Sequence, residues 1–172
     1  CSSDLDGPRR REAARDAVGR DAVPRRRLGD LNAVRSRRRP REIFLSRAEQ
    51  EPARVDRAIR GVVEMLGRHR IAVWTAPARV RAAQHWHDQI GEALARCDWF
   101  VVALTRRSVA RPWVKRELLF ALNDKRYDER IVPLVFQDCA IEKLSWVLRS
   151  SMQVVDFTGD RARAQRQLLA TW

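Results

Sequence analysis

A tryptophan and a glutamate four positions apart, Trp113 and Glu117, are the residues of this chain whose types and spacing best fit chemistry. Side chains at positions i and i+4 of a helix are neighbours on its surface. A carboxylate beside an indole at the edge of an apolar stripe is poorly solvated, and poor solvation raises the pKa of a carboxyl group. Spacing alone favours a simpler interpretation, a surface glutamate that interacts with the positive N-terminal end of the helix dipole.

The segment from Pro112 to Lys125 is expected to form the helix that carries both side chains. Proline suits the first turn of a helix, where its missing N–H costs nothing. Apolar residues then recur at helical spacing and form one stripe that faces a core. The stripe consists of Val114, Leu118, Ala121 and Leu122, and the two candidate side chains flank it.

Length and composition predict one domain preceded by a basic arm. The chain has 172 residues, of which 45% are hydrophobic, and this suffices for one domain with a substantial core. Its formal net charge is +13, and nearly all of its cations are arginines. This bias fits a GC-rich coding sequence as well as a nucleic-acid-binding protein, so composition does not decide between them.

Cysteine usage and hydropathy favour a cytoplasmic setting. The cysteines, Cys1, Cys97 and Cys139, have neither the spacing of a disulfide framework nor that of a metal site. No apolar run approaches the roughly 20 residues that span a bilayer, and there is no signal-peptide pattern. We therefore expect a cytoplasmic domain with no membrane partner.

Residues 1–41 are expected to form a basic, disordered arm or linker before a domain at 42–172. Residues 1–5 resemble a translated sequencing adapter and are left out of the fold. The rest of the arm is rich in arginine, with prolines and glycines and no sustained apolar period. It lacks aromatic residues on which bases stack, so nucleic-acid binding through the arm is the weaker interpretation.

Strand and helix patterns alternate from residue 42 onward. Apolar runs predict strands at 43–45, 71–74, 99–104, 131–136 and 152–157. Helical spacing predicts helices at 55–66, 86–97, 112–125 and 161–172, with a short helix or turn at 141–148. Strands that are apolar along their whole length are typical of a parallel sheet covered on both faces. We expect an α/β three-layer sandwich around a five-stranded parallel sheet, with right-handed crossovers.

The loops after the first three strands form the candidate site. In open parallel sheets, ligands bind beyond the carboxyl ends of the strands, near a switch in strand order. These loops are 46–51, 75–84 and 105–112, and the last of them leads to Trp113 and Glu117.

Other chemistries lack support in the sequence. His85 and His87 lie two positions apart and do not share a helix face, so no joint metal site is expected. The chain has no G-x-S-x-G elbow, no G-x-G-x-x-G turn and no P-loop. A receiver domain would need an acidic pair after the first strand and an aspartate after the third strand. In this chain Glu49 lies near the first of these places and Thr105 near the second, so a receiver domain is not favoured.

Four motifs follow one another in a characteristic order. Ile43-Phe44-Leu45-Ser46 and Ile71-Ala72-Val73-Trp74 are strands, and Trp86 opens the next helix. The run at 99–105 is followed by Ser108 and by Trp113-Val114-Lys115-Arg116-Glu117. Together, over residues 42–160, they resemble a Toll/interleukin-1 receptor (TIR) domain of the bacterial kind, with its first three strands and its Ser…Trp-x-x-x-Glu signature.

The resemblance implies a flavodoxin-like fold and one of two activities. Some TIR domains are scaffolds that assemble through TIR–TIR contacts, and others hydrolyse NAD⁺ at the nicotinamide–ribose bond, typically in bacterial antiphage defence or cell death. In the hydrolases the glutamate of Trp-x-x-x-Glu is catalytic, which implies that role for Glu117. The resemblance further implies NAD⁺ as substrate, other TIR domains as partners, and neither a cofactor nor a metal.

The resemblance also implies a set of substrate-binding residues. Trp113 and Trp86 are expected to stack on the nicotinamide or to position the ribose. The others lie in the loops after the first two strands: Ser46, Arg47, Ala48, Thr75 and Arg79. Arg47 and Arg79 fit two interpretations, as ligands of the pyrophosphate or as surface arginines.

The chain differs from the usual TIR pattern in three segments. Arg47 stands where an aromatic residue or histidine is common, and Thr75 stands where an acid often follows the strand. The residues at 82–84 replace an acid and a glycine in a loop that shapes the nucleotide site and the assembly contact in relatives. A non-catalytic scaffold therefore remains the alternative to a hydrolase.

Overall fold

A computed structural model describes residues 40–76, 86–145, 147–150 and 152–172 of this chain. In this part, five parallel strands form one sheet in the order β2-β1-β3-β4-β5. The strands are β1 (Glu42–Ser46), β2 (Ala72–Trp74), β3 (Trp99–Leu104), β4 (Ile131–Val135) and β5 (Val155–Asp156). The arm expected over residues 1–41 lies, up to residue 39, outside the described residues.

Helices connect the strands and complete the expected α/β sandwich. The α-helices are α1 (Ala53–Arg68), α2 (Trp86–Arg96), α3 (Pro112–Asn123), α4 (Val147–Ser150) and α5 (Arg161–Leu169). Short 3-10 helices are η2 (Ser108–Ala110), η3 (Lys125–Tyr127) and η4 (Ile141–Lys143). The five-stranded parallel sheet is confirmed, although β5 is shorter than the strand expected at 152–157. Among the described residues, no helix is long and apolar enough to cross a membrane.

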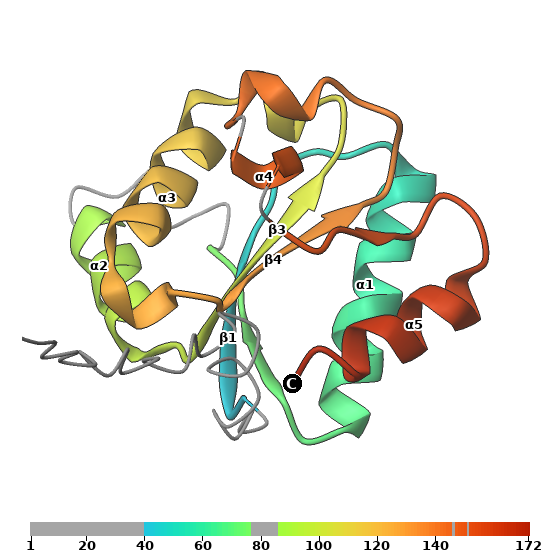
Figure 1. The fold of residues 1–172 in the computed structure, drawn as a ribbon, viewed down its shortest axis with the longest axis horizontal. Coiled ribbons are helices and arrows are strands. Elements are labelled where there is room, and N and C mark those ends of the chain that lie inside the picture. The colour runs from blue at the N-terminus through green and yellow to red at the C-terminus, as the bar shows by residue number, and fades with distance from the viewer. Residues whose placement is uncertain (1–39, 77–85, 146, 151) are drawn as a thin grey trace, which may run out of the picture. The chain divides into compact units, whose positions relative to one another are not determined.

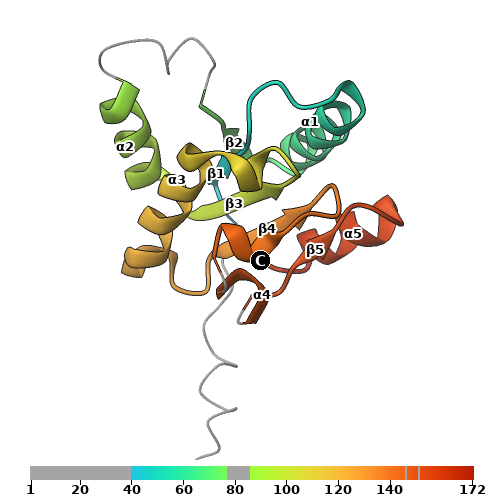
Figure 2. The same cartoon turned by 90° about the horizontal axis from the view of Figure 1, so that it is seen from above.

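Alternate residues of the strands supply two separate hydrophobic cores. Ile43 and Leu45 of β1 pack on one face of the sheet with the apolar sides of α1 and α5. Phe44 packs on the other face with residues of α2 and α3. Figures 1 and 2 show the resulting three layers, with α1 and α5 on one side of the strands and α2 and α3 on the other. Because side chains alternate along a strand, Ser46 falls on the same face as Phe44.

An aromatic row crosses three strands on the face covered by α2 and α3. Phe44 of β1 pairs in register with Trp74 of β2 and with Phe100 of β3. Its ring stacks on both, with centroids 4.8 Å from the Trp74 ring and 5.5 Å from the Phe100 ring. Phe44 and Phe100 are fully buried, so this row joins the strands on either side of the switch in strand order.

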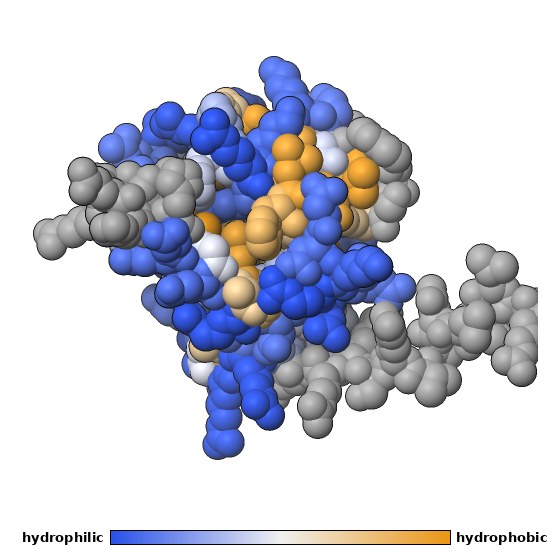
Figure 3. All heavy atoms as spheres, turned by 90° about the vertical axis from the view of Figure 1, so that its left-hand side faces the viewer, coloured by the Kyte–Doolittle hydropathy of each residue, from blue (hydrophilic) through white to orange (hydrophobic). Residues whose placement is uncertain are grey.

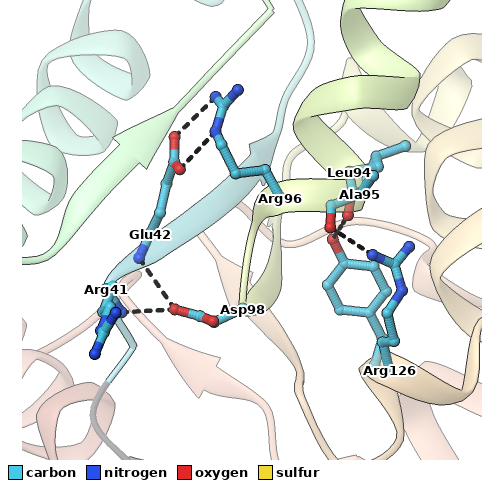
Figure 4. Close-up of polar contacts among 8 residues, drawn as sticks. Arg41, Glu42, Leu94, Ala95, Arg96, Asp98 and Arg126 are labelled. Carbon is cyan, nitrogen blue, oxygen red and sulfur yellow. Dashed lines mark hydrogen bonds and ion pairs between the residues drawn. The ribbon is translucent and has the colours of Figure 1, made fainter.

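Polar contacts fix the amino-terminal edge of the sheet (Figure 4). The Arg96 guanidinium donates two hydrogen bonds to the Glu42 carboxylate, at 2.8 and 3.0 Å. Asp98 accepts hydrogen bonds from the backbone N–H groups of Arg41, at 2.8 Å, and Glu42, at 3.4 Å. These contacts join the start of β1 to the turn between α2 and β3.

The last residue of the chain also lies at this edge. The ring of Trp172 packs edge-on against Trp99, the first residue of β3, with centroids 5.4 Å apart. We call the end of the sheet where β1 begins and Trp172 packs the amino edge. The opposite end, where the strands finish and the loops of the candidate site lie, is the carboxyl edge.

Candidate active site

The helix α3 begins where the sequence predicts and buries the predicted stripe. Pro112 occupies its first turn. Val114, Leu118 and Ala121 are at most 1% exposed, and they pack in the core shared with α2. Glu117 is buried with them, at 2% exposure, although its spacing predicts a position at the edge of the stripe. The simpler interpretation of Glu117 as a surface residue is therefore wrong.

Within the described residues, Ser46 and Trp113 both donate hydrogen bonds to the buried carboxylate of Glu117. The Ser46 hydroxyl donates a hydrogen bond to Oε2, and the Trp113 indole N–H donates one to Oε1. Ser46 is itself 1% exposed. A carboxylate buried without donors would be strongly destabilising, and these two hydrogen bonds offset part of that cost. Ser46, predicted from the first-strand motif, thus forms one cluster with Trp113 and Glu117, which were predicted together from their spacing.

The topology explains why Ser46 and Glu117 meet. Ser46 is the last residue of β1 and points to the face on which α3 packs, two residues beyond Phe44. Ser46 pairs in register with Val102, and β1 and β3 are central neighbours at the switch in strand order. The cluster therefore lies where open parallel sheets usually bind their ligands.

The other predicted residues of the first loop have different partners. Arg47 forms an ion pair with Asp56 of α1, and its Nε donates to the Ala48 carbonyl at 3.4 Å. The hydrogen bond from Arg47 lowers the pKa of Asp56, and the charges of Arg47 and Arg60 add to this effect. Ala48 is 1% exposed, so it contributes packing rather than an accessible side chain. The Arg47 guanidinium is thus engaged by α1 in this structure.

The second loop is described in part. Thr75 follows β2 directly and is half-buried. Trp86 is the first residue of α2, as predicted, but its side chain lies outside the described residues. Arg79 and the departures at 82–84 also lie outside them.

A second buried carboxyl group was not predicted. Glu51, at the end of the loop after β1, is 8% exposed and accepts a hydrogen bond from the Thr105 hydroxyl at 2.6 Å. Thr105 and Ser108 are both fully buried. The sequence offers a signal for the turn that holds Thr105, because a threonine directly after a buried strand and three residues before a serine suits side-chain capping, but it offers none for the contact with Glu51.

The carboxyl edge also has an open hollow of about 530 Å³ beside the site. It lies between the loops after β3 and β4 and is lined by Arg106, Val109, Asp138, Cys139, Ala140, Glu142 and Lys143. None of the predicted site residues whose side chains the structure describes lines this hollow. Within the described ranges, no group of three or more His, Cys, Asp or Glu side chains has an arrangement that could hold a metal ion.

Comparison with known proteins agrees with this architecture. A family model described as TIR domain matches residues 43–169. No curated protein is significantly similar in sequence. The structure is similar to the TIR domain of the Toll-related receptor TRR-2 from Hydra magnipapillata, with 15% identity and a TM-score of 0.58. That match covers 74% of this chain and 94% of the Hydra chain.

A second structural match is to the TIR domains of the activated Roq1 resistosome, which directly recognises the pathogen effector XopQ. The identity is 13% and the TM-score is 0.54, over 75% of this chain and 97% of that chain. At such identities the two structures support the fold. Because the family model also covers most of the chain, the chain belongs to the TIR-domain family.

Proposed function

We propose that this TIR domain hydrolyses NAD⁺ at the nicotinamide–ribose bond, with Glu117 as its catalytic residue. The observation that carries the proposal is the cluster at the switch in strand order, in which Ser46 and Trp113 hold the Glu117 carboxylate. A buried, hydrogen-bonded carboxylate at that place is costly for the fold and therefore suggests a function.

The chemistry of the reaction suits a single carboxylate. Breaking the glycosidic bond expels neutral nicotinamide, so the leaving group needs no proton. The ribose is left with oxocarbenium character, and a nearby carboxylate stabilises the developing positive charge. In this proposal the ribose hydroxyls displace Ser46 or Trp113 as donors to Glu117. The Trp113 ring, which is half-buried at the start of α3, then stacks on the nicotinamide or positions the ribose.

We further propose that self-association activates the reaction, in bacterial defence or cell-death signalling. The pyrophosphate would be bound by Arg47, Arg79 or both. Binding by Arg47 would require its guanidinium to exchange Asp56 for the substrate. Ala48 and Thr75 would then form part of the wall of the site.

A non-catalytic interaction module is the second candidate. The observation that favours it is a pair of exposed apolar side chains on α3, Leu119 at 42% and Phe120 at 45% exposure. Figure 3 shows the side of the molecule where α2 and α3 lie, with hydrophobic side chains exposed among hydrophilic ones. In this alternative the domain mediates protein–protein signalling contacts and does not turn over nucleotide at any concentration.

The deciding experiment measures loss of NAD⁺ by chromatography. Purified full chain is assayed at rising concentration and after clustering on beads, beside Glu117→Gln. Glutamine keeps an acceptor for Trp113 and places its amide against Ser46, so the fold is retained while the charge is lost. Glu64→Gln, which neutralises an exposed carboxylate of α1, is the matched control.

Each outcome separates the candidates. Turnover that rises steeply with concentration, persists in Glu64→Gln and is lost in Glu117→Gln supports the assembly-gated hydrolase. Full turnover by Glu117→Gln would remove Glu117 from its proposed role. A folded, clustered wild-type protein without turnover would favour the interaction module.

A further inference from the structure

Glu51 is buried in a way that its role as a loop residue does not explain. Its side chain is 8% exposed, Oε1 accepts the Thr105 hydroxyl, and Oε2 is buried with no hydrogen-bond partner among the residues that the structure describes. A loop carboxyl group can usually rotate outward into solvent, which lowers its free energy. The burial of Glu51 therefore indicates that the surrounding residues maintain its contact with Thr105.

Thr105 belongs to a reciprocal network at the end of β3. The Ser108 backbone N–H donates to the Thr105 hydroxyl oxygen at 2.9 Å, and the Thr105 backbone N–H donates to the Ser108 hydroxyl oxygen at 2.8 Å. The Ser108 hydroxyl donates in turn to the Thr105 carbonyl at 3.1 Å. The network fixes the turn that forms η2, and η2 leads directly into Pro112 at the start of α3.

A second contact joins the same two loops. The Arg107 guanidinium donates a hydrogen bond to the carbonyl of Gln50, the residue before Glu51. Gln50 has a φ of 54°, in the left-handed region that residues other than glycine seldom adopt. Such a conformation persists where the surrounding contacts determine it. Here Arg107 binds the carbonyl of Gln50, and Thr105 binds the side chain of the next residue, Glu51.

These contacts complete a closed series of contacts that includes the candidate catalytic residue, Glu117. Loop 47–51 starts immediately after Ser46, which holds Glu117. Loop 105–111 ends at α3, which carries Glu117. The Glu51–Thr105 hydrogen bond joins the end of the first loop to the start of the second, so it adds a link between the strand that carries Ser46 and the segment that leads to Glu117.

We propose that Glu51 is a positioning residue, which joins the loops after β1 and β3 through Thr105 and thereby holds Ser46 and Glu117 in register. The contact needs an acceptor oxygen at Glu51 and does not need its charge. Burial raises the pKa of Glu51, against the opposing effects of the Thr105 hydrogen bond and the charges of Arg47 and Arg107, and Asp56 adds to the rise.

The test compares Glu51→Gln with Glu51→Met. Glutamine keeps the acceptor oxygen that Thr105 uses and loses the charge. Methionine keeps the length of the side chain and loses the acceptor. Removal of a costly buried carboxyl group opposes the loss of the Thr105 hydrogen bond, so the variant is expected to remain folded. Thr105→Val removes the donor of the same contact, and Glu64→Gln is again the exposed control.

The first readout needs no substrate. Hydrogen exchange of peptides covering residues 105–118 is expected to be faster in Glu51→Met and Thr105→Val and unchanged in Glu51→Gln. The free energy of unfolding of the wild type, relative to Glu51→Gln, is expected to decrease as pH rises from 4.5 through the raised pKa of Glu51. Unchanged exchange in Glu51→Met would overturn the positioning role, whatever the activity of the domain.

The second readout rests on the proposed function. Glu51→Met and Thr105→Val are expected to lower kcat by about tenfold with little change in KM, while Glu51→Gln retains kcat within about twofold. A well-folded Glu51→Met with wild-type kcat would overturn the proposal. Faster exchange in Glu51→Met, in a protein whose wild type has no turnover, would support the loop contact and refute the hydrolase.

Discussion

Ser46, the last residue of β1, donates its hydroxyl hydrogen bond to Oε2 of Glu117, in the second turn of α3. The two residues are 71 positions apart in the chain, and both are almost fully buried. The hydrogen bond thus connects a central strand of the sheet to the helix that follows its neighbour. It also means that the Glu117 carboxylate is held from outside its own helix as well as by Trp113.

Replacing Ser46 by alanine should therefore destabilise the fold as well as the site. The substitution leaves Oε2 of Glu117 buried without this donor, and we expect a loss of about 1–3 kcal/mol in the free energy of unfolding. Urea denaturation measures this loss. Thr158→Ala removes an exposed hydroxyl and should change the free energy by less than about 0.5 kcal/mol. Equal effects of the two substitutions would contradict the importance of the Ser46–Glu117 contact.

The aromatic row should dominate the stability of the core between the sheet and α2–α3. Phe44 is fully buried and contacts Trp74 and Phe100, so Phe44→Ala leaves a cavity at the centre of the sheet. We expect a loss of about 3–5 kcal/mol, measured by chemical denaturation. Phe120→Ala, at an exposed position on α3, is the size-matched control and should cost far less. A mild effect at Phe44 would mean that the core relaxes around the missing ring.

The ion pair between Arg47 and Asp56 should give acid-sensitive stability. Because the folded protein lowers the pKa of Asp56 below its ordinary value of 3.8, the pair stabilises the fold above that pH and loses its effect as pH falls. Asp56→Asn should cost about 0.5–1 kcal/mol at pH 7 and progressively less below pH 4. Unfolding measured across this range checks the trend, with Asp128→Asn as an exposed control. A difference that grows toward low pH would contradict the assignment.

The two described cysteines should react at different rates. Cys97 is 6% exposed, and burial raises its pKa to about 12, so little thiolate is present or accessible at pH 8. Cys139 is partly exposed, although burial raises its pKa as well. Iodoacetamide should therefore label Cys139 first and Cys97 at a rate set by unfolding, as peptide mass spectrometry would show. Faster labelling of Cys97 would indicate that the end of α2 opens in the folded state.

Most of the fold could be predicted because it depends on local patterns. Apolar runs and helical spacing are read within a few residues, and they placed every strand of the sheet and helices α1, α2, α3 and α5 near their observed positions. Proline at the start of α3 and the pairing of Trp113 with Glu117 are equally local. The short β5 was overestimated because its extent depends on its pairing with the end of β4.

The rest of the site depends on contacts between distant segments. Nothing in the local sequence distinguishes Glu51 from an exposed acidic loop residue. Its burial follows from a contact with Thr105, 54 positions later. Arg47 was expected either to bind the pyrophosphate or to be a surface arginine, and neither interpretation foresaw that the start of α1 places Asp56 within its reach. In both cases the residue type was visible in the sequence, while the partner was set by how the loops pack at the carboxyl edge.

The position of Trp172 against Trp99 has a practical consequence for experiments on this domain. Residue 40 and residue 172 both lie at the amino edge of the sheet, opposite the edge that holds Ser46 and Glu117. A tether attached at residue 172 would start roughly the length of β1, about 16 Å, from the cluster of Ser46, Trp113 and Glu117. Immobilisation through residue 172, on a sensor surface or a bead, should therefore leave the loops at the carboxyl edge facing the solution.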